Sequence, residues 1–113
     1  MDTTIFVILL YVLVGCLLII LGLPLLLEKI KPNWLYGFRL PKTMSNKEIW
    51  YKSNKYVGRD LIIAGVIVII GSIFLLIFRS IFPLEIIVFT GSFLIIIPIV
   101  AVLFRGLSYL KKL

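Results

Sequence analysis

The fold is decided by an apolar stretch in the middle of the chain, LIIAGVIVIIGSIFLLIF at residues 61–78, which contains no charged residue. As a helix at 1.5 Å per residue, these residues would be about 27 Å long, close to the hydrocarbon thickness of a bilayer. Two further uncharged runs, at 3–27 and 86–104, flank it. Since backbone polar groups cannot stay unpaired in lipid, each run is expected to be a helix. The stretch therefore predicts an integral membrane protein.

The composition favours the same class of protein. Of the 113 residues, 62% are apolar and 15% are charged, whereas about a quarter are charged in soluble domains. We expect an all-α integral membrane fold that forms a single membrane domain over residues 1–113. Its expected parts are three transmembrane helices at about 4–27, 60–78 and 82–104, a long cytoplasmic loop at 28–59 and a cytoplasmic tail at 105–113. Because so few residues around Arg79 separate the last two spans, they should form an antiparallel hairpin.

Basic residues are concentrated at one end of these spans. The loop at 28–59 holds eight Lys and Arg residues and the tail holds three, whereas the opposite side holds only Arg79. Loops rich in Lys and Arg usually stay in the cytoplasm. We therefore expect a multi-pass protein of the cell membrane, with the N-terminus outside and the C-terminus in the cytoplasm. The basic loop should contact anionic lipid headgroups.

Several functional classes are disfavoured by the residues that the chain lacks. It has no histidine, and its five acidic residues are scattered without the spacing of a catalytic pair or a cation site. We expect no enzyme activity, no metal site and no cofactor. The net charge of +7 raises nucleic acid as a partner, but the basic residues lie beside spans and among aromatics, which favours lipid headgroups instead. Cys16 ends a lipoprotein-like box, but no basic residue precedes the run, so we interpret it as a packing residue.

Small residues recur on two of the predicted spans. Gly15 and Gly22 are seven residues apart, as are Gly65 and Ser72, so each pair lies on one helix face. Small residues at such spacing let membrane helices approach closely. We expect internal packing of the three spans, and self-association into a homo-oligomer stays as the alternative.

The loop at 28–59 is longer than two antiparallel spans require, and its aromatics argue against disorder. Its first part, 31–41, is bounded by prolines and should be irregular and lie along the headgroup layer. Ser45 and Glu48 have the spacing of a capping box. A short interfacial helix should follow and run towards the second span, with Gly58 as the joint.

Within this loop, residues 33–58 resemble the signature of the SdpI family of bacterial and archaeal membrane proteins. The residues that carry the resemblance are Asn33, Gly37, Phe38, Arg39, Pro41, Thr43, Ser45, Trp50, Asn54 and Gly58. The family is named for an immunity protein against a secreted killing peptide, in which immunity is coupled to sequestering a transcriptional repressor at the membrane. That protein has about twice as many spans, and this chain resembles its signature-bearing half. The resemblance implies a prokaryotic cell membrane, a peptide toxin as partner and a cytoplasmic regulator as a further one.

The signature residues suggest a polar site on the cytoplasmic side. Arg39 follows a Gly37–Phe38 turn and could present its planar guanidinium to a carboxylate or phosphate. We expect a pocket that includes Arg39, with Asp60 as its internal partner. The other predicted site residues are Asn33, Gly37, Trp50 and Asn54. The alternative is that these residues only anchor the loop to headgroups, and Arg39→Lys separates the two because a simple anchor tolerates lysine.

Two functional classes follow for the whole chain. The first is immunity to a membrane-active peptide toxin, with signalling through the basic loop as an added role. The second is an accessory or structural subunit of a larger membrane complex. A small transporter is less favoured, since the spans hold too few polar residues to line an aqueous path.

Overall fold

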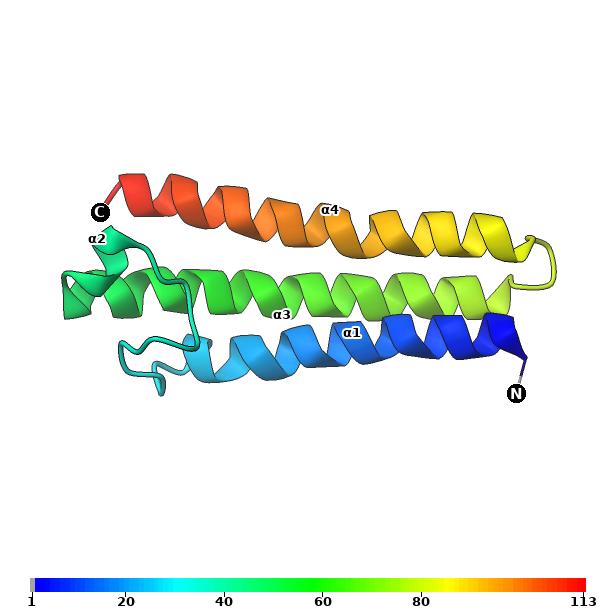
Figure 1. The fold of residues 1–113 in the computed structure, drawn as a ribbon, viewed down its shortest axis with the longest axis horizontal. Coiled ribbons are helices and arrows are strands. Elements are labelled where there is room, and N and C mark those ends of the chain that lie inside the picture. Colours follow the sequence, from blue (N-terminus) through cyan, green and yellow to red (C-terminus); the bar gives the residue numbers. More distant parts are fainter. Residues whose placement is uncertain (1) are drawn as a thin grey trace.

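The computed structural model describes residues 2–113 as three long helices that lie side by side and antiparallel (Figure 1). The elements are α1 (Thr3–Leu26), α2 (Pro41–Met44), α3 (Lys47–Ile77) and α4 (Leu84–Lys111). The three long helices are all long and apolar enough to cross a membrane, which confirms the predicted all-α membrane fold. We call the end with α2 and the C-terminus the loop end, and the end with the N-terminus and residues 78–83 the hairpin end (Figure 1).

Glycines bring the backbones of α1 and α3 into direct contact. A Cβ atom added at Gly22 would lie 2.5 Å from the Gly58 carbonyl oxygen, and one added at Gly65 would lie 2.5 Å from the Gly15 carbonyl oxygen. No side chain fits at these crossings, so all four positions need glycine. The predicted small-residue faces are therefore used for packing inside the chain.

The helix predicted after the capping box is present, but it is continuous with the second span, which corrects the expectation of a joint between them. Gly58 is an interior residue of α3, not a joint, and residues 47–59 continue the axis of the span (Figure 1). The low helix propensity of glycine suggested a break, but the close approach of α1 at Gly58 outweighs it, because tertiary packing overrides propensity. With 31 residues, α3 is about 46 Å long and projects beyond the hydrocarbon.

The start of α3 is capped by a different residue from the one predicted. The Asn46 side chain, not that of Ser45, accepts hydrogen bonds from the amides of Glu48 (2.8 Å) and Ile49 (3.3 Å). The Ser45 hydroxyl instead donates to the Lys42 carbonyl at 2.9 Å. The Glu48 carboxylate pairs with Lys52 at 2.8 Å, and this hydrogen bond and charge lower its pKa. The four-residue helix α2 turns the chain just before Asn46 and so shifts the cap by one residue.

The C-terminal segment predicted as a tail is the last part of α4, which continues to Lys111. It packs on the projecting part of α3: the Tyr109 ring stacks on Tyr56 with ring centres 4.3 Å apart, and Leu110 is buried. The Lys42 ammonium donates to the Leu110 carbonyl at 2.9 Å and so caps this helix end with a positive charge. The loop end is therefore a folded structure held by α3, α4 and the loop together.

Candidate functional site

Two buried side chains on α3 hold the loop. Trp50 is fully buried, and its indole N–H donates to the Ile30 carbonyl at 2.9 Å. Asn54 is 2% exposed; its side-chain oxygen accepts the Phe38 amide at 2.6 Å, and its amide donates to the Trp50 carbonyl at 2.9 Å. Both residues were predicted as site residues. We call Trp50, Asn54 and the loop residues that they hold the loop clasp.

Gly37 and Thr43 complete the loop clasp. Gly37 has φ +120°, and a Cβ atom there would lie 2.8 Å from the Trp50 ring and 2.9 Å from the Asn54 side-chain oxygen. Only glycine therefore lets the loop cross so close to α3. The hydroxyl of Thr43, which is fully buried, lies 2.9 Å from the Phe38 carbonyl and accepts the Leu40 amide at 2.8 Å.

Asn33 organises the loop before it reaches the clasp. Its side-chain oxygen accepts the amides of Leu35 (2.9 Å) and Tyr36 (2.7 Å), and its amide donates to the Lys31 carbonyl at 2.7 Å. These bonds form a local turn of the kind that asparagine favours. The polar atoms of Asn33 are thus engaged by its own loop, as those of Asn54 and Trp50 are engaged by the clasp.

Arg39 does not join this group, and its expected pairing with Asp60 is wrong. The Arg39 side chain is exposed and lies beside a shallow hollow lined by Trp34 and Met44. Asp60 is instead bound by Arg105, whose Nε lies 2.7 Å from Oδ2, and by Arg59, whose Nη2 lies 3.4 Å from Oδ1. The loop turns Arg39 outward, whereas the antiparallel hairpin brings Arg105 of α4 level with Asp60 of α3.

This second group at the loop end was not found from the sequence. It consists of Asp60, Arg59 and Arg105, together with the stacked rings of Tyr56 and Tyr109. A signal was present, since Asp60 and Arg105 border the uncharged runs of two spans that form a hairpin and must therefore lie at similar depth. Among residues 2–113, no three Cys, Asp or Glu side chains gather as a metal site would require.

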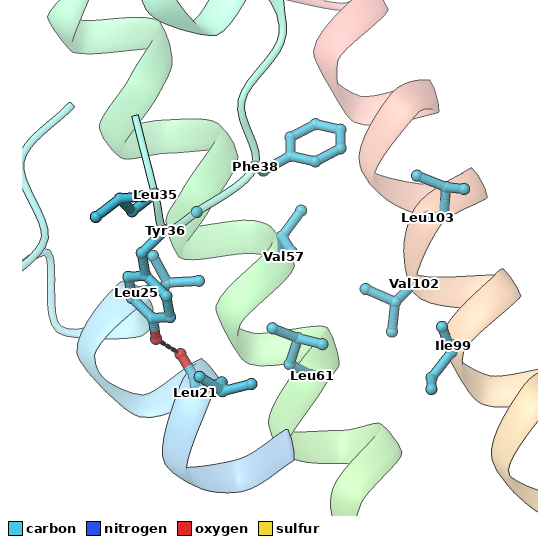
Figure 2. A pocket seen from close by; sticks show the side chains of 11 residues that line it. Leu21, Leu25, Leu35, Tyr36, Phe38, Val57, Leu61, Ile99, Val102 and Leu103 are labelled. Atoms are coloured by element: carbon cyan, nitrogen blue, oxygen red, sulfur yellow. Dashed lines mark hydrogen bonds between the residues drawn. The ribbon is translucent and has the colours of Figure 1, made fainter. Parts of the chain in front are cut away.

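An apolar cavity of about 400 Å³ lies between the loop-end halves of the three long helices (Figure 2). Residues 35–38 of the loop cover it and are called the roof. The helices contribute Leu21, Leu25, Val57, Leu61, Ile99, Val102 and Leu103. The cavity is partly open, and its size is within the range of about 300–1,000 Å³ that is usual for small-molecule sites.

Tyr36 fixes the roof to α1. Its ring lies along α1 and its hydroxyl donates to the Leu21 carbonyl (Figure 2). Partial burial raises the pKa of the Tyr36 phenol above its ordinary value. Phe38 points towards α4, where Gly106 leaves space for its ring. Trp34 and Leu35 are mostly exposed at 80% and 94%. Only exposed side chains of this part of the loop, such as Trp34 and Leu35, are therefore free to contact lipid headgroups.

Several residues of the loop clasp, and Gly37 and Phe38 of the roof, are among the residues that suggested a known family. Comparison with protein families matches residues 29–107 to the SdpI/YfhL protein family. The matched range includes the loop, all of α3 and most of α4. No curated protein and no solved structure matches the chain. Since the match includes more than half of its residues, the chain belongs to the SdpI/YfhL protein family.

Proposed function

We propose that this chain is an immunity-type membrane protein, which protects its cell by binding a membrane-active peptide within the bilayer. The observation that carries the proposal is the apolar cavity of about 400 Å³ under the roof. Family membership supports it, because the family is named for an immunity protein against a secreted killing peptide. The signature residues Gly37, Phe38 and Asn54 shape or hold the roof of this cavity.

The cavity suits apolar side chains of a peptide that reaches it through the membrane. Lipid tails are as apolar as such side chains, so the hydrophobic effect gives little preference for the cavity over the bilayer. Selectivity must come from shape and packing, and the cavity walls are mainly branched aliphatic side chains. A peptide with side chains of matching shape would be held at the loop end of the helices.

We place the loop end on the cytoplasmic side of a prokaryotic cell membrane, because Lys and Arg are concentrated there. The peptide would then be captured after it has entered the bilayer. The exposed lysines of this end, such as Lys47 and Lys111, would contact anionic headgroups. They also offer a surface for an acidic cytoplasmic regulator. Because the loop clasp joins the roof to α3, a peptide bound in the cavity would alter this basic surface.

A substitution that fills the cavity tests the proposal. Ile99 lines the cavity from α4, whereas Ile97 on the same helix is 61% exposed and lies away from it. Sensitive cells would express the wild type, Ile99→Trp or Ile97→Trp at matched membrane levels and be challenged with a panel of membrane-active killing peptides. We expect protection by the wild type and by Ile97→Trp, and its loss in Ile99→Trp.

Two outcomes would count against the proposal. Equal protection by Ile99→Trp and the wild type would exclude the cavity as the binding site. A wild type that protects against no peptide, but co-purifies with a membrane partner in fixed ratio, would favour an accessory subunit instead.

A further inference from the structure

The carboxylate of Asp60 is matched by more positive charge than it can neutralise. Asp60 is 5% exposed and contacts the guanidinium groups of both Arg59 (3.4 Å) and Arg105 (2.7 Å). One negative and two positive charges leave a surplus of +1 in this group. The two arginine side chains are 50% and 54% exposed, so the surplus charge lies at the surface.

An aromatic ring holds both guanidinium groups in place. The Arg59 guanidinium lies 4.9 Å from the centre of the Tyr56 ring, and that of Arg105 lies 5.5 Å from it. Tyr56 is itself stacked on Tyr109, with an angle of 3° between the rings. Each guanidinium has five N–H donors, and its hydrogen bond to Asp60 uses only one of its nitrogens. Fixed donors with surplus positive charge form a receptor for an oxyanion.

An apolar slot begins directly at this charged group. It has a volume of about 230 Å³, lies between α3 and α4, and includes Asp60 and Arg105 at one end. Ile63 and Ile67 line it from α3, so it extends about 10 Å along the helix towards the hairpin end. On the α4 side the slot is lined by the small side chain of Ala101 and the ring of Pro98. The slot is separate from the apolar cavity, although Val102 borders both.

The depth of the group in the membrane indicates what binds there. Asp60 and Arg105 immediately border the uncharged runs 61–78 and 86–104. Their charges therefore lie where the hydrocarbon meets the headgroups, which is the level of lipid phosphates. The slot then extends from the phosphate level into the hydrocarbon, as a lipid tail does.

We propose that Arg59, Arg105 and the slot bind one anionic phospholipid. Its phosphodiester oxygens accept hydrogen bonds from the two guanidinium groups, and the first part of one acyl chain lies in the slot. The surplus of +1 favours a net anionic headgroup over a zwitterionic one. This site does not depend on the peptide cavity, and the lipid would hold α3 and α4 together at the loop end.

Native mass spectrometry of the full chain in mild detergent tests the proposal. The probes are phosphatidylglycerol, phosphatidylcholine and inorganic phosphate. The variants are Arg59→Gln, which keeps the Arg105–Asp60 pair, and Ala101→Leu, which fills the slot. Lys55→Gln is the matched control, since it removes the same charge one turn away. Circular dichroism and thermal unfolding confirm that each variant is folded.

We expect phosphatidylglycerol to bind the wild type at least about tenfold more tightly than phosphatidylcholine, and Arg59→Gln to lose about tenfold, as charge-assisted hydrogen bonds imply. Ala101→Leu should also weaken lipid binding, whereas Lys55→Gln should change it by less than about threefold because Lys55 forms no ion pair with Asp60 and so is not held in this group. Equal losses in Arg59→Gln and Lys55→Gln would reduce the site to a general basic surface. Inorganic phosphate that displaces the lipid at equal concentration would exclude a role for the slot.

Discussion

Removal of the Asn54 side chain should release the loop from α3. The change Asn54→Ala takes away both hydrogen bonds from this side chain to the loop, in which it accepts the Phe38 amide (2.6 Å) and donates to the Phe38 carbonyl (3.5 Å). Asn54 is 2% exposed, so water does not readily replace either bond. Each buried hydrogen bond contributes about 1–1.5 kcal/mol. The free energy of local loop opening should therefore fall by about 2–3 kcal/mol.

The assay is amide hydrogen exchange followed by mass spectrometry on the purified full chain. A loss of about 2–3 kcal/mol corresponds to exchange that is about 30- to 150-fold faster at the Phe38 amide, because exchange of a protected amide follows the local opening equilibrium. The effect should be confined to the loop end. Residues 78–83 at the hairpin end should exchange as in the wild type.

A second asparagine of the same helix provides the control. Asn46 caps the start of α3 at its exposed end, where its side chain binds the amides of Glu48 and Ile49 and not that of Phe38. Asn46→Ala should cost about 1 kcal/mol of helix capping and increase exchange at residues 47–50. The Phe38 amide should change little. If Phe38 exchange in Asn54→Ala stays within about threefold of the wild type, or if Asn46→Ala accelerates it equally, the loop clasp does not hold the loop.

Two further substitutions test the packing and the loop surface. Gly65→Ala should lower the free energy of unfolding by about 1–3 kcal/mol, measured by thermal unfolding in detergent, because its Cβ would lie 2.5 Å from the Gly15 carbonyl oxygen; unchanged stability would mean that the helices can separate at no cost. Arg39→Lys should leave stability and peptide protection unchanged, because the Arg39 side chain is exposed; a loss of protection at matched membrane levels would instead indicate a bidentate site at this residue.

The membrane spans could be predicted because lipid imposes a simple rule on the sequence. An uncharged run long enough to cross the hydrocarbon must be a helix, so the runs 3–27, 61–78 and 86–104 match parts of α1, α3 and α4 to within one residue. Where the helices continue beyond the hydrocarbon, this rule no longer applies. The extensions of α3 and α4 are stabilised by each other, through contacts such as Tyr56 on Tyr109. Such contacts depend on three-dimensional register, which local patterns do not specify.

The candidate site was predicted only in part, because local sequence patterns do not specify three-dimensional register. Trp50, Asn54 and Gly37 do lie together, because the family signature places them at a helical spacing opposite an irregular loop. The partner of Asp60 was assigned wrongly because the direction of Arg39 depends on loop geometry. Arg105 was the better candidate, since the depth of both residues follows from the hairpin alone.

The signature of the family, in this chain, mainly specifies a structure. Asn54 and Trp50 use their polar atoms in hydrogen bonds to backbone groups of the loop and of α3, and Gly58 allows α1 and α3 to make direct contact. A buried polar group that is fully bonded has little capacity left for a ligand. Two surfaces beside the signature residues remain able to bind a ligand. They are the apolar cavity under the roof and the surplus positive charge at Arg59 and Arg105. Under the proposed function, the specificity of this chain should therefore reside in the residues that line these two surfaces, and exchange of cavity-lining residues such as Ile99 should change the peptide recognised while the signature stays the same.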